Sequence, residues 1–206
     1  MAGKLVIVDF GISNLNSVHK VMVRLHPEVI ISSRPEDIEH ADKIILPGIG
    51  HFQKAMENLE KYQLIDPLHE AVLINKKPVL GICMGMQLMA KSSSEGHTNG
   101  LGWMDGVVVR YHVTTPSDFK IPHLGWNRII RKKSSLLMDN IVDESEFYFA
   151  HSYHWKTDHV QDILAETKYN YLFPSAIEKE NIFGVQFHPE KSYDAGIKLL
   201  NNFILL

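Results

Sequence analysis

The chain has 206 residues, a length that suits a single domain with a substantial buried core. Hydrophobic residues make up 45% and charged residues 22%, and a net charge of −3 with a pI of about 6.4 argues against a nucleic-acid-binding protein. One cysteine excludes an internal disulfide framework and fits a reducing compartment, and no apolar run approaches the roughly 18 residues of a membrane span. The N-terminus enters a strand without the leader of a signal peptide, so we expect a cytoplasmic protein.

The first half of the chain alternates short apolar strands with amphipathic helices. Strands are predicted over 5–8, 29–31, 43–46 and 78–82. Helices or helical turns are predicted over 15–25, 35–40, 52–59 and 68–73. This alternation predicts parallel strand pairing with helices on both faces of the sheet. The polar segment 91–99 that follows is the predicted mobile loop.

The second half has closely spaced strands, separated by turn signals, and a final helix over 194–206. The strands are predicted over 107–113, 128–130, 146–150, 163–165 and 182–187. We therefore predict an α/β fold with a mostly parallel central sheet flanked by helices and antiparallel strands added in the C-terminal half. No repeat, low-complexity stretch or linker divides the chain, which favours one domain over 1–206.

Cys83 lies in residues 81–85, with the sequence Gly-Ile-Cys-Met-Gly, between a predicted strand and an apolar stretch. A strand that ends at a nucleophile and turns at once into a helix needs a tight, strained turn. Flanking glycines permit that backbone and leave room for a substrate carbonyl. The helix N-terminus behind the turn favours a thiolate. A lone cysteine is more often a small buried hydrophobe, but these flanking residues favour a nucleophile.

His188 is the candidate base, because it follows the predicted strand 182–187. In an open α/β sheet the C-terminal strand ends line the ligand crevice, where Cys83 would also lie. Pro189 forces a turn, and Glu190 could then bond the imidazole, fix its tautomer and stabilise the imidazolium. These side chains would supply the nucleophile, base and orienting group for thiol attack on an amide.

Residues 47–50, with the sequence Pro-Gly-Ile-Gly, follow the third predicted strand. Their two glycines would let the backbone turn an N–H toward a developing oxyanion, although an ordinary strand–helix turn would also use them. His151 and His154 have the spacing of a metal-ligand pair, but no third ligand is in view. We therefore predict no metal site.

Three motifs together resemble the class I glutamine amidotransferases: Pro-Gly-x-Gly, Gly-x-Cys-x-Gly-Met-Gln and Gln-Phe-His-Pro-Glu-Lys-Ser. Enzymes of that family use a Cys-His-Glu triad to hydrolyse glutamine and pass the ammonia onward. The chain is closer still to the glutaminase subunits of imidazole glycerol phosphate synthase, whose further motifs are matched by residues 11–15, 122–127 and 148–153. The resemblance spans residues 8–203.

The resemblance implies a role for each matching residue. Cys83 would be the nucleophile, His188 the base and Glu190 its partner. The oxyanion hole would consist of Gly48, Ile49, Gly50 and the Met84 amide. The amino-acid end of L-glutamine would be held by Gln87, Ser152 and Tyr153. A synthase partner would be met by Asn14, His123, Trp126 and Lys191. No cofactor is implied, and the chain has no nucleotide-binding glycine pattern, so the acceptor chemistry is expected on a second chain.

Two departures from the subfamily leave the acceptor open. Ser13 stands where a glycine is usual, and Ala90 and Lys91 replace an aromatic residue and a glutamate. One reading is a glutaminase that supplies the cyclase of imidazole glycerol phosphate synthase in histidine biosynthesis. A second is a paralogue that supplies a sugar amidotransferase in surface-polysaccharide synthesis. A third, a catalytically silent regulatory subunit, is disfavoured by the intact triad.

Overall fold

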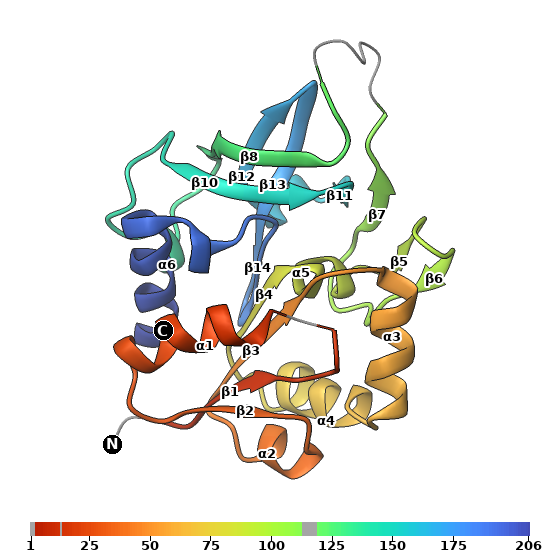
Figure 1. Cartoon of the computed structure of the whole chain (residues 1–206), viewed down its shortest axis with the longest axis vertical. Helices are drawn as coiled ribbons and strands as arrows, with labels where there is room; N and C mark the ends of the chain where they lie inside the picture. Colours follow the sequence, from red (N-terminus) through yellow and green to blue (C-terminus); the bar gives the residue numbers. More distant parts are fainter. Residues whose placement is uncertain (1–2, 13, 113–118) are drawn as a thin grey trace.

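The computed structural model describes residues 3–12, 14–112 and 119–206 (Figure 1). Its centre is an eight-stranded sheet with the order β2-β1-β3-β4-β14-β13-β12-β9. The strands are β1 (Leu5–Val8), β2 (Val29–Ser32), β3 (Lys43–Gly48), β4 (Val79–Cys83), β9 (Ile130–Arg131), β12 (Ile163–Tyr169), β13 (Tyr171–Lys179) and β14 (Ile182–Val185). Strands β2, β1, β3, β4 and β14 are parallel, whereas β13, β12 and β9 continue the sheet in antiparallel pairing.

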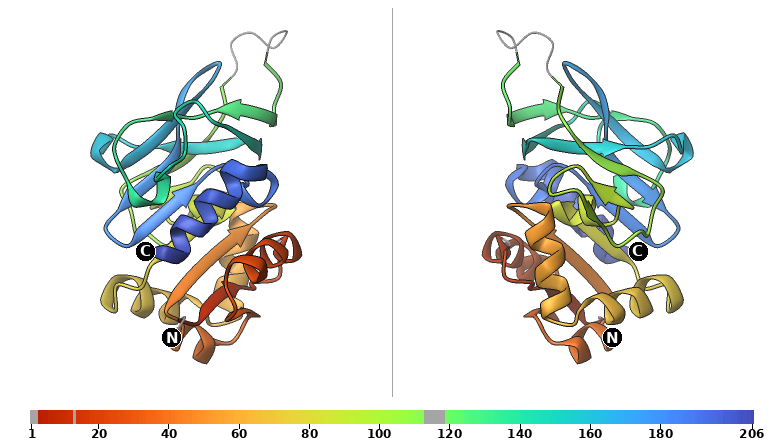
Figure 2. Two further views of the ribbon diagram at one scale, coloured as in Figure 1. Left: turned by 90° about the vertical axis from the view of Figure 1, so that its left-hand side faces the viewer. Right: turned by 90° about the vertical axis from the view of Figure 1, so that its right-hand side faces the viewer.

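Helices cover both faces of the parallel part. Successive residues of a strand point to opposite faces of the sheet, so a strand that is apolar throughout packs against both layers of helices. The helices are α1 (Leu15–Leu25), α2 (Pro35–Glu39), α3 (Phe52–Lys61), α4 (Ile65–His69), the π-helix η1 (Glu70–Ile74), α5 (Met84–Leu88) and α6 (Tyr193–Leu205). Leu5 and Ile7 pack in one core with α1 and α6, and Val6 and Val8 pack in another with α3, α4 and α5. Figure 2 shows α1 and α6 on one side of the sheet and α3 on the other.

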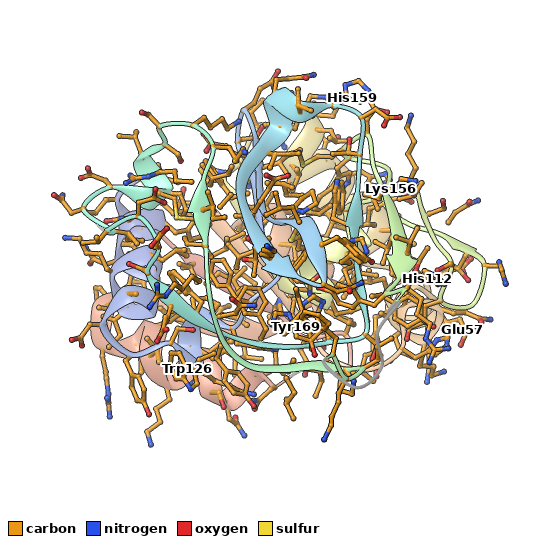
Figure 3. All side chains as sticks on the ribbon, turned by 90° about the horizontal axis from the view of Figure 1, so that it is seen from above. Glu57, His112, Trp126, Lys156, His159 and Tyr169 are labelled. Carbon is orange, nitrogen blue, oxygen red and sulfur yellow. The ribbon has the colours of Figure 1, made fainter. Side chains whose placement is uncertain are left out.

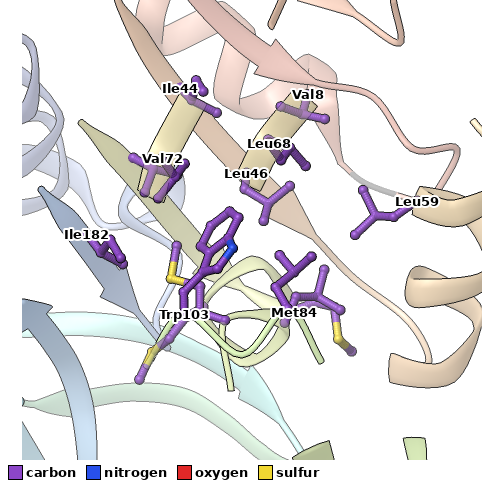
Figure 4. Packing of buried hydrophobic residues seen from close by; sticks show 14 of the residues in the cluster. Val8, Ile44, Leu46, Leu59, Leu68, Val72, Met84, Trp103 and Ile182 are labelled. Carbon is purple, nitrogen blue, oxygen red and sulfur yellow. The ribbon is translucent and has the colours of Figure 1, made fainter. Parts of the chain in front are cut away.

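The core beneath the candidate site is tightly filled. Leu46 and Met84 are buried there with Trp103, and Leu68 and Val72 close the layer from the helical side (Figure 4). Truncating a fully buried leucine of this kind costs about 2–5 kcal/mol. This packed core therefore holds the strand ends that carry the candidate residues in position.

Two smaller sheets accompany the central sheet and are built mostly from the second half of the chain. One pairs β8 (His123–Arg128) with β10 (Glu146–His151), and the other has the order β11-β7-β5-β6. The latter strands are β5 (Ser92–Ser93), β6 (Thr98–Asn99), β7 (Val107–Arg110) and β11 (Tyr153–Lys156). Figure 1 shows β8 and β10 above the parallel strands. Single turns of 3₁₀ helix, η2 (Leu136–Met138), η3 (Val160–Asp162) and η4 (Pro189–Lys191), connect these elements.

The predicted fold class is confirmed, and each element predicted in the first half is present within a few residues. In the second half, β11 and β13 are missed; β13 contains a proline at position 174, a residue that is uncommon inside strands. Residues 123–128 form a strand of which only Arg128 was predicted, and the predicted strand 128–130 is divided between β8 and β9. Segment 91–99 holds β5 and β6 rather than a continuous loop. The predicted strand 107–113 is observed to Arg110, and Val113 lies outside the described residues, as does Ser13.

Candidate active site

The turn at Cys83 has the strained geometry that the sequence predicts. Strand β4 ends at Cys83, whose φ of 54° and ψ of −107° are unusual for a residue with a side chain, and α5 begins at the next residue. A Cβ atom on Gly85 would lie 1.6 Å from the carbonyl oxygen of Leu46. Only glycine at position 85 therefore lets α5 approach β3 this closely, and the approach holds the thiol at the end of the sheet.

His188 and Glu190 form a buried pair beside that thiol. The Nδ1 atom of His188 lies 2.9 Å from Oε1 of Glu190, and the two side chains are only 4% and 1% exposed. The backbone of His188 is fixed as well, because its N–H donates to the carbonyl of Tyr148 and its own carbonyl accepts from the hydroxyl of Ser192. The imidazole therefore has one orientation.

The surroundings of His188 favour its charged form. Burial by itself lowers the pKa of an imidazole, but the electrostatic and hydrogen-bond interactions with Cys83 and with Glu190 outweigh it and raise the pKa of His188 to about 10. The imidazole of His188 is therefore held in its protonated form at neutral pH. Within the described residues, Oε2 of Glu190 is buried without a hydrogen-bond partner.

A cavity of about 220 Å³ opens in front of Cys83. Its lining consists of Ile49, Gly50, Cys83, Met84, Gln87, Glu95, Pro122, Ala150, His151, Ser152 and Tyr153. All three predicted substrate-binding residues thus face the same space as the candidate nucleophile. The cavity joins the helix after β4, the loop after β3 and the turn between β10 and β11.

The side-chain amide of Gln87 donates twice within the protein. Its Nε2 atom lies 3.0 Å from the carbonyl oxygen of Tyr153 and 2.9 Å from Oε1 of Gln186. An amide nitrogen has two hydrogens, so the remaining polar atom, Oε1, is the one that can accept from a ligand.

Glu95 is a cavity residue that sequence reasoning missed. It lies between β5 and β6, and its Oε2 accepts the backbone N–H of Phe52, the first residue of α3, at 2.8 Å. A carboxylate in this cavity suits a ligand that carries an ammonium group. The polar segment 91–99 gave no signal of this role, because only the pairing of β5 with β7 brings it to the site.

The loop of residues 47–50 reaches the cavity, but its backbone is turned away. The N–H of Ile49 donates to the carbonyl oxygen of Ile12 at 3.3 Å, and Gly48 still pairs with Cys83 at the end of β3. Gly50 has a φ of +94°, which suits glycine. In this conformation the Ile49 amide is therefore unavailable as an oxyanion donor.

The residues expected to face a partner divide into two groups. Trp126 is 44% exposed on β8 and stacks on Tyr193 with ring centroids 5.0 Å apart. The Nζ atom of Lys191 lies 5.6 Å from the centroid of the Tyr148 ring, which also contacts Trp126. Helix α1, which Asn14 precedes, contacts η4, where Lys191 lies. Trp126, Tyr148, Lys191 and Tyr193 thus form one surface group, here called the aromatic–lysine patch.

His123, which was expected to meet the partner, is buried instead. It is only 3% exposed, because alternation along β8 turns it inward, where it stacks between Phe149 and Tyr169. Its Nδ1 atom lies 3.1 Å from Nε2 of His151. It cannot offer a side chain to a partner, unlike Trp126 three residues later.

The ring nitrogens of His151 and His154 are occupied by hydrogen bonds. Nδ1 of His151 donates to the carbonyl of Tyr153, and His154 bonds the carbonyl of Trp155 and the hydroxyl of Tyr171. Burial lowers the pKa of both imidazoles. Over the described parts of the chain, no group of three His, Cys, Asp or Glu side chains is placed to hold a metal, and no helix is long and apolar enough to cross a membrane.

Comparisons with known proteins agree with this arrangement. The family model described as glutamine amidotransferase class-I matches residues 6–206. The imidazole glycerol phosphate synthase subunit HisH 2 of Methanococcus maripaludis is 43% identical over 198 residues, which cover 96% of this chain and 97% of the relative. The subunit HisH of a Geobacillus species is 44% identical over 200 residues, 96% of this chain and 94% of that one.

Solved structures support the same fold. The structure of PurLQS from Thermotoga maritima aligns with a TM-score of 0.73 at 16% identity, over 100% of this chain and 99% of that chain. At this identity the likeness concerns the fold.

Proposed function

Because the chain belongs to the class I glutamine amidotransferase family, we propose that it is the glutaminase subunit of an imidazole glycerol phosphate synthase. It hydrolyses L-glutamine to glutamate and ammonia, and it passes the ammonia to a cyclase subunit in histidine biosynthesis. The observation that carries the proposal is the buried His188–Glu190 pair beside Cys83 at the wall of an amino-acid-sized cavity. The relatives above 40% identity support the acceptor.

The proposed reaction uses the three side chains in sequence. The Cys83 thiolate attacks the side-chain carbonyl carbon of glutamine, and the carbonyl oxygen becomes an oxyanion. The His188 imidazolium then gives its proton to the departing nitrogen, so that ammonia leaves and a thioester remains. Water attacks the thioester, His188 takes up its proton, and the thiolate is released with glutamate. Glu190 holds His188 in the required tautomer throughout.

The cavity supplies contacts for the amino-acid end of the substrate. We propose that Glu95 and the Oε1 atom of Gln87 receive the α-ammonium group, while the backbone of Ser152 and Tyr153 holds the carboxylate. These charged contacts are made equally in the ground and transition states, so they set the KM for glutamine more than kcat.

We further propose that the partner docks on the aromatic–lysine patch and that the 206 residues form one amidotransferase domain. Ammonia must leave the site without becoming ammonium in bulk water, which requires a sealed contact over the cavity. Trp126 would be the aromatic anchor of this contact and Lys191 its fixed charge. A cytoplasmic location follows from this pathway and from the free thiol that the reaction needs.

The test is reconstitution with a cyclase subunit. The purified chain and the cyclase are mixed with glutamine and the cyclase substrate, and both glutamate and imidazole glycerol phosphate are measured. Formation of both in a one-to-one ratio supports the proposal. Glutamate without imidazole product would contradict the histidine pathway and favour another acceptor such as a sugar amidotransferase, an alternative without support among the relatives described above.

A further inference from the structure

Gln186 is a completely buried polar residue next to the candidate nucleophile. It follows the last residue of β14, and its backbone N–H donates to the carbonyl of Ser175 at 2.9 Å. Its side-chain Nε2 lies 3.6 Å from Sγ of Cys83. A buried side-chain amide is expected to have hydrogen-bond partners, and for the Nε2 atom of Gln186 that partner is the sulfur of Cys83.

The direction of the Gln186 amide is fixed by its neighbours. The carbonyl of Tyr153 can only accept, so Gln87 must turn its NH₂ group toward it. The second hydrogen of that group goes to Gln186, which must therefore present its oxygen to Gln87. The opposite end, an N–H donor, is left facing the sulfur of Cys83.

We propose that Gln186 is a fourth catalytic residue, whose side-chain N–H donates a hydrogen bond to the Cys83 thiolate and fixes the position of the sulfur. This inference rests on the proposed glutaminase function. The amide carries no titratable proton, so its donation persists at every pH at which the thiolate exists. The donor favours the thiolate over the thiol before attack, and it favours the departing thiolate again when water cleaves the thioester.

The role of Gln186 differs from that of His188. His188 exchanges a proton with the leaving ammonia and the incoming water, whereas Gln186 only donates a hydrogen bond. Gln87, which fixes the amide of Gln186, then has a second task besides binding substrate. Three successive hydrogen bonds link the carbonyl of Tyr153 to Gln87, Gln87 to Gln186, and Gln186 to Cys83. A shift of the cavity wall at Tyr153 would therefore also shift the sulfur of the nucleophile.

The test is the pH dependence of Cys83 alkylation by iodoacetamide, which reports the thiolate without requiring glutamine turnover. Cys83 is the only cysteine, so the signal has one source. In Gln186→Met, which keeps the side-chain length but removes the donor, we expect the alkylation midpoint to rise by about one to two pH units. We also expect kcat/KM for glutamine near pH 7 to fall about 10- to 100-fold.

Two further variants separate this role from a structural one. Gln87→Met frees the Gln186 amide to rotate and should raise the alkylation midpoint by less. Asn202→Leu removes a buried amide of α6 that donates to two backbone carbonyls, and it should lower stability and leave the midpoint unchanged. The titratable groups that face Cys83, namely His188 beside it and His151 and Glu95 across the cavity, are the same in every variant.

An unchanged midpoint in both Gln186→Met and Gln87→Met would overturn the proposal, as would a loss of stability in Gln186→Met with a wild-type pH profile. Failure of the glutaminase proposal has a different signature: the wild-type chain with its cyclase would release no glutamate, while the alkylation profiles could still differ among the variants.

Discussion

The hydrogen bond between Ile49 and Ile12 leads to a prediction about the chain without its partner. If the Ile49 N–H is the second oxyanion donor, the peptide between Gly48 and Ile49 must rotate before it can serve. We expect this rotation to be driven by docking of the cyclase, and the isolated chain to be a poor glutaminase.

The size of the effect follows from what opposes the rotation. The N–H gives up a neutral hydrogen bond of 3.3 Å to Ile12, and the end of the β3–β4 ladder at Gly48 and Cys83 is disturbed. Each restraint is worth about 1 kcal/mol, so together they slow the isolated chain about 30-fold. The upper bound is complete loss of one oxyanion donor, about 10²- to 10³-fold.

The assay is glutamate release by the isolated chain and by the complex with its acceptor substrate. The donor acts in the transition state, so kcat should change more than the KM for glutamine. A complex containing Cys83→Ala measures background hydrolysis. Equal kcat values for the isolated chain and the complex would refute the reasoning.

Three further predictions concern the triad and the partner surface. Cys83→Ala should lower glutamine hydrolysis about 10³-fold or more and keep the thermal midpoint near wild type; a variant that stays active would remove Cys83 from the mechanism. Glu190→Gln should reduce activity less, because it only misorients His188. The pKa of His188 is raised in the folded chain from 6.5 to about 10, so its protonation stabilises the fold below pH 6.5 and this contribution is lost as the pH rises toward 10. In Glu190→Gln that loss should be smaller, as measured by denaturant unfolding at about pH 6 and about pH 9. Trp126→Ala and Lys191→Ala should lower the ratio of imidazole product to glutamine hydrolysed. Val160→Ala is a matched exposed control, because its neighbour His159 lies at the opposite edge of the molecule from Trp126 (Figure 3). Wild-type ratios and partner affinities in both patch variants would show that the interface lies elsewhere.

Local sequence determined the parts of the site that depend on neighbouring residues. The strained turn at Cys83 requires small flanking residues, because a side chain at position 85 would overlap the backbone of β3. His188 and Glu190 are two residues apart across a proline, so their hydrogen bond is also a local property. The alternation of strands and helices in the first half, whose apolar pattern has a clear period, was predicted for the same reason.

Tertiary structure alone decided the contacts between distant segments. Strand β14 pairs with β4 in a register that sets Val185 beside Ile82, and this register brings Gln186 to the sulfur of Cys83. The sequence gives the length and polarity of the Gln186 side chain. It does not give the contacts of that side chain with Gln87 and Cys83, because those residues lie about a hundred positions away in the chain. The inward turn of His123 and the arrival of Glu95 at the cavity depend in the same way on strand pairing. Pairing is a long-range property, since the free energy that selects a register comes from the whole buried face of the sheet.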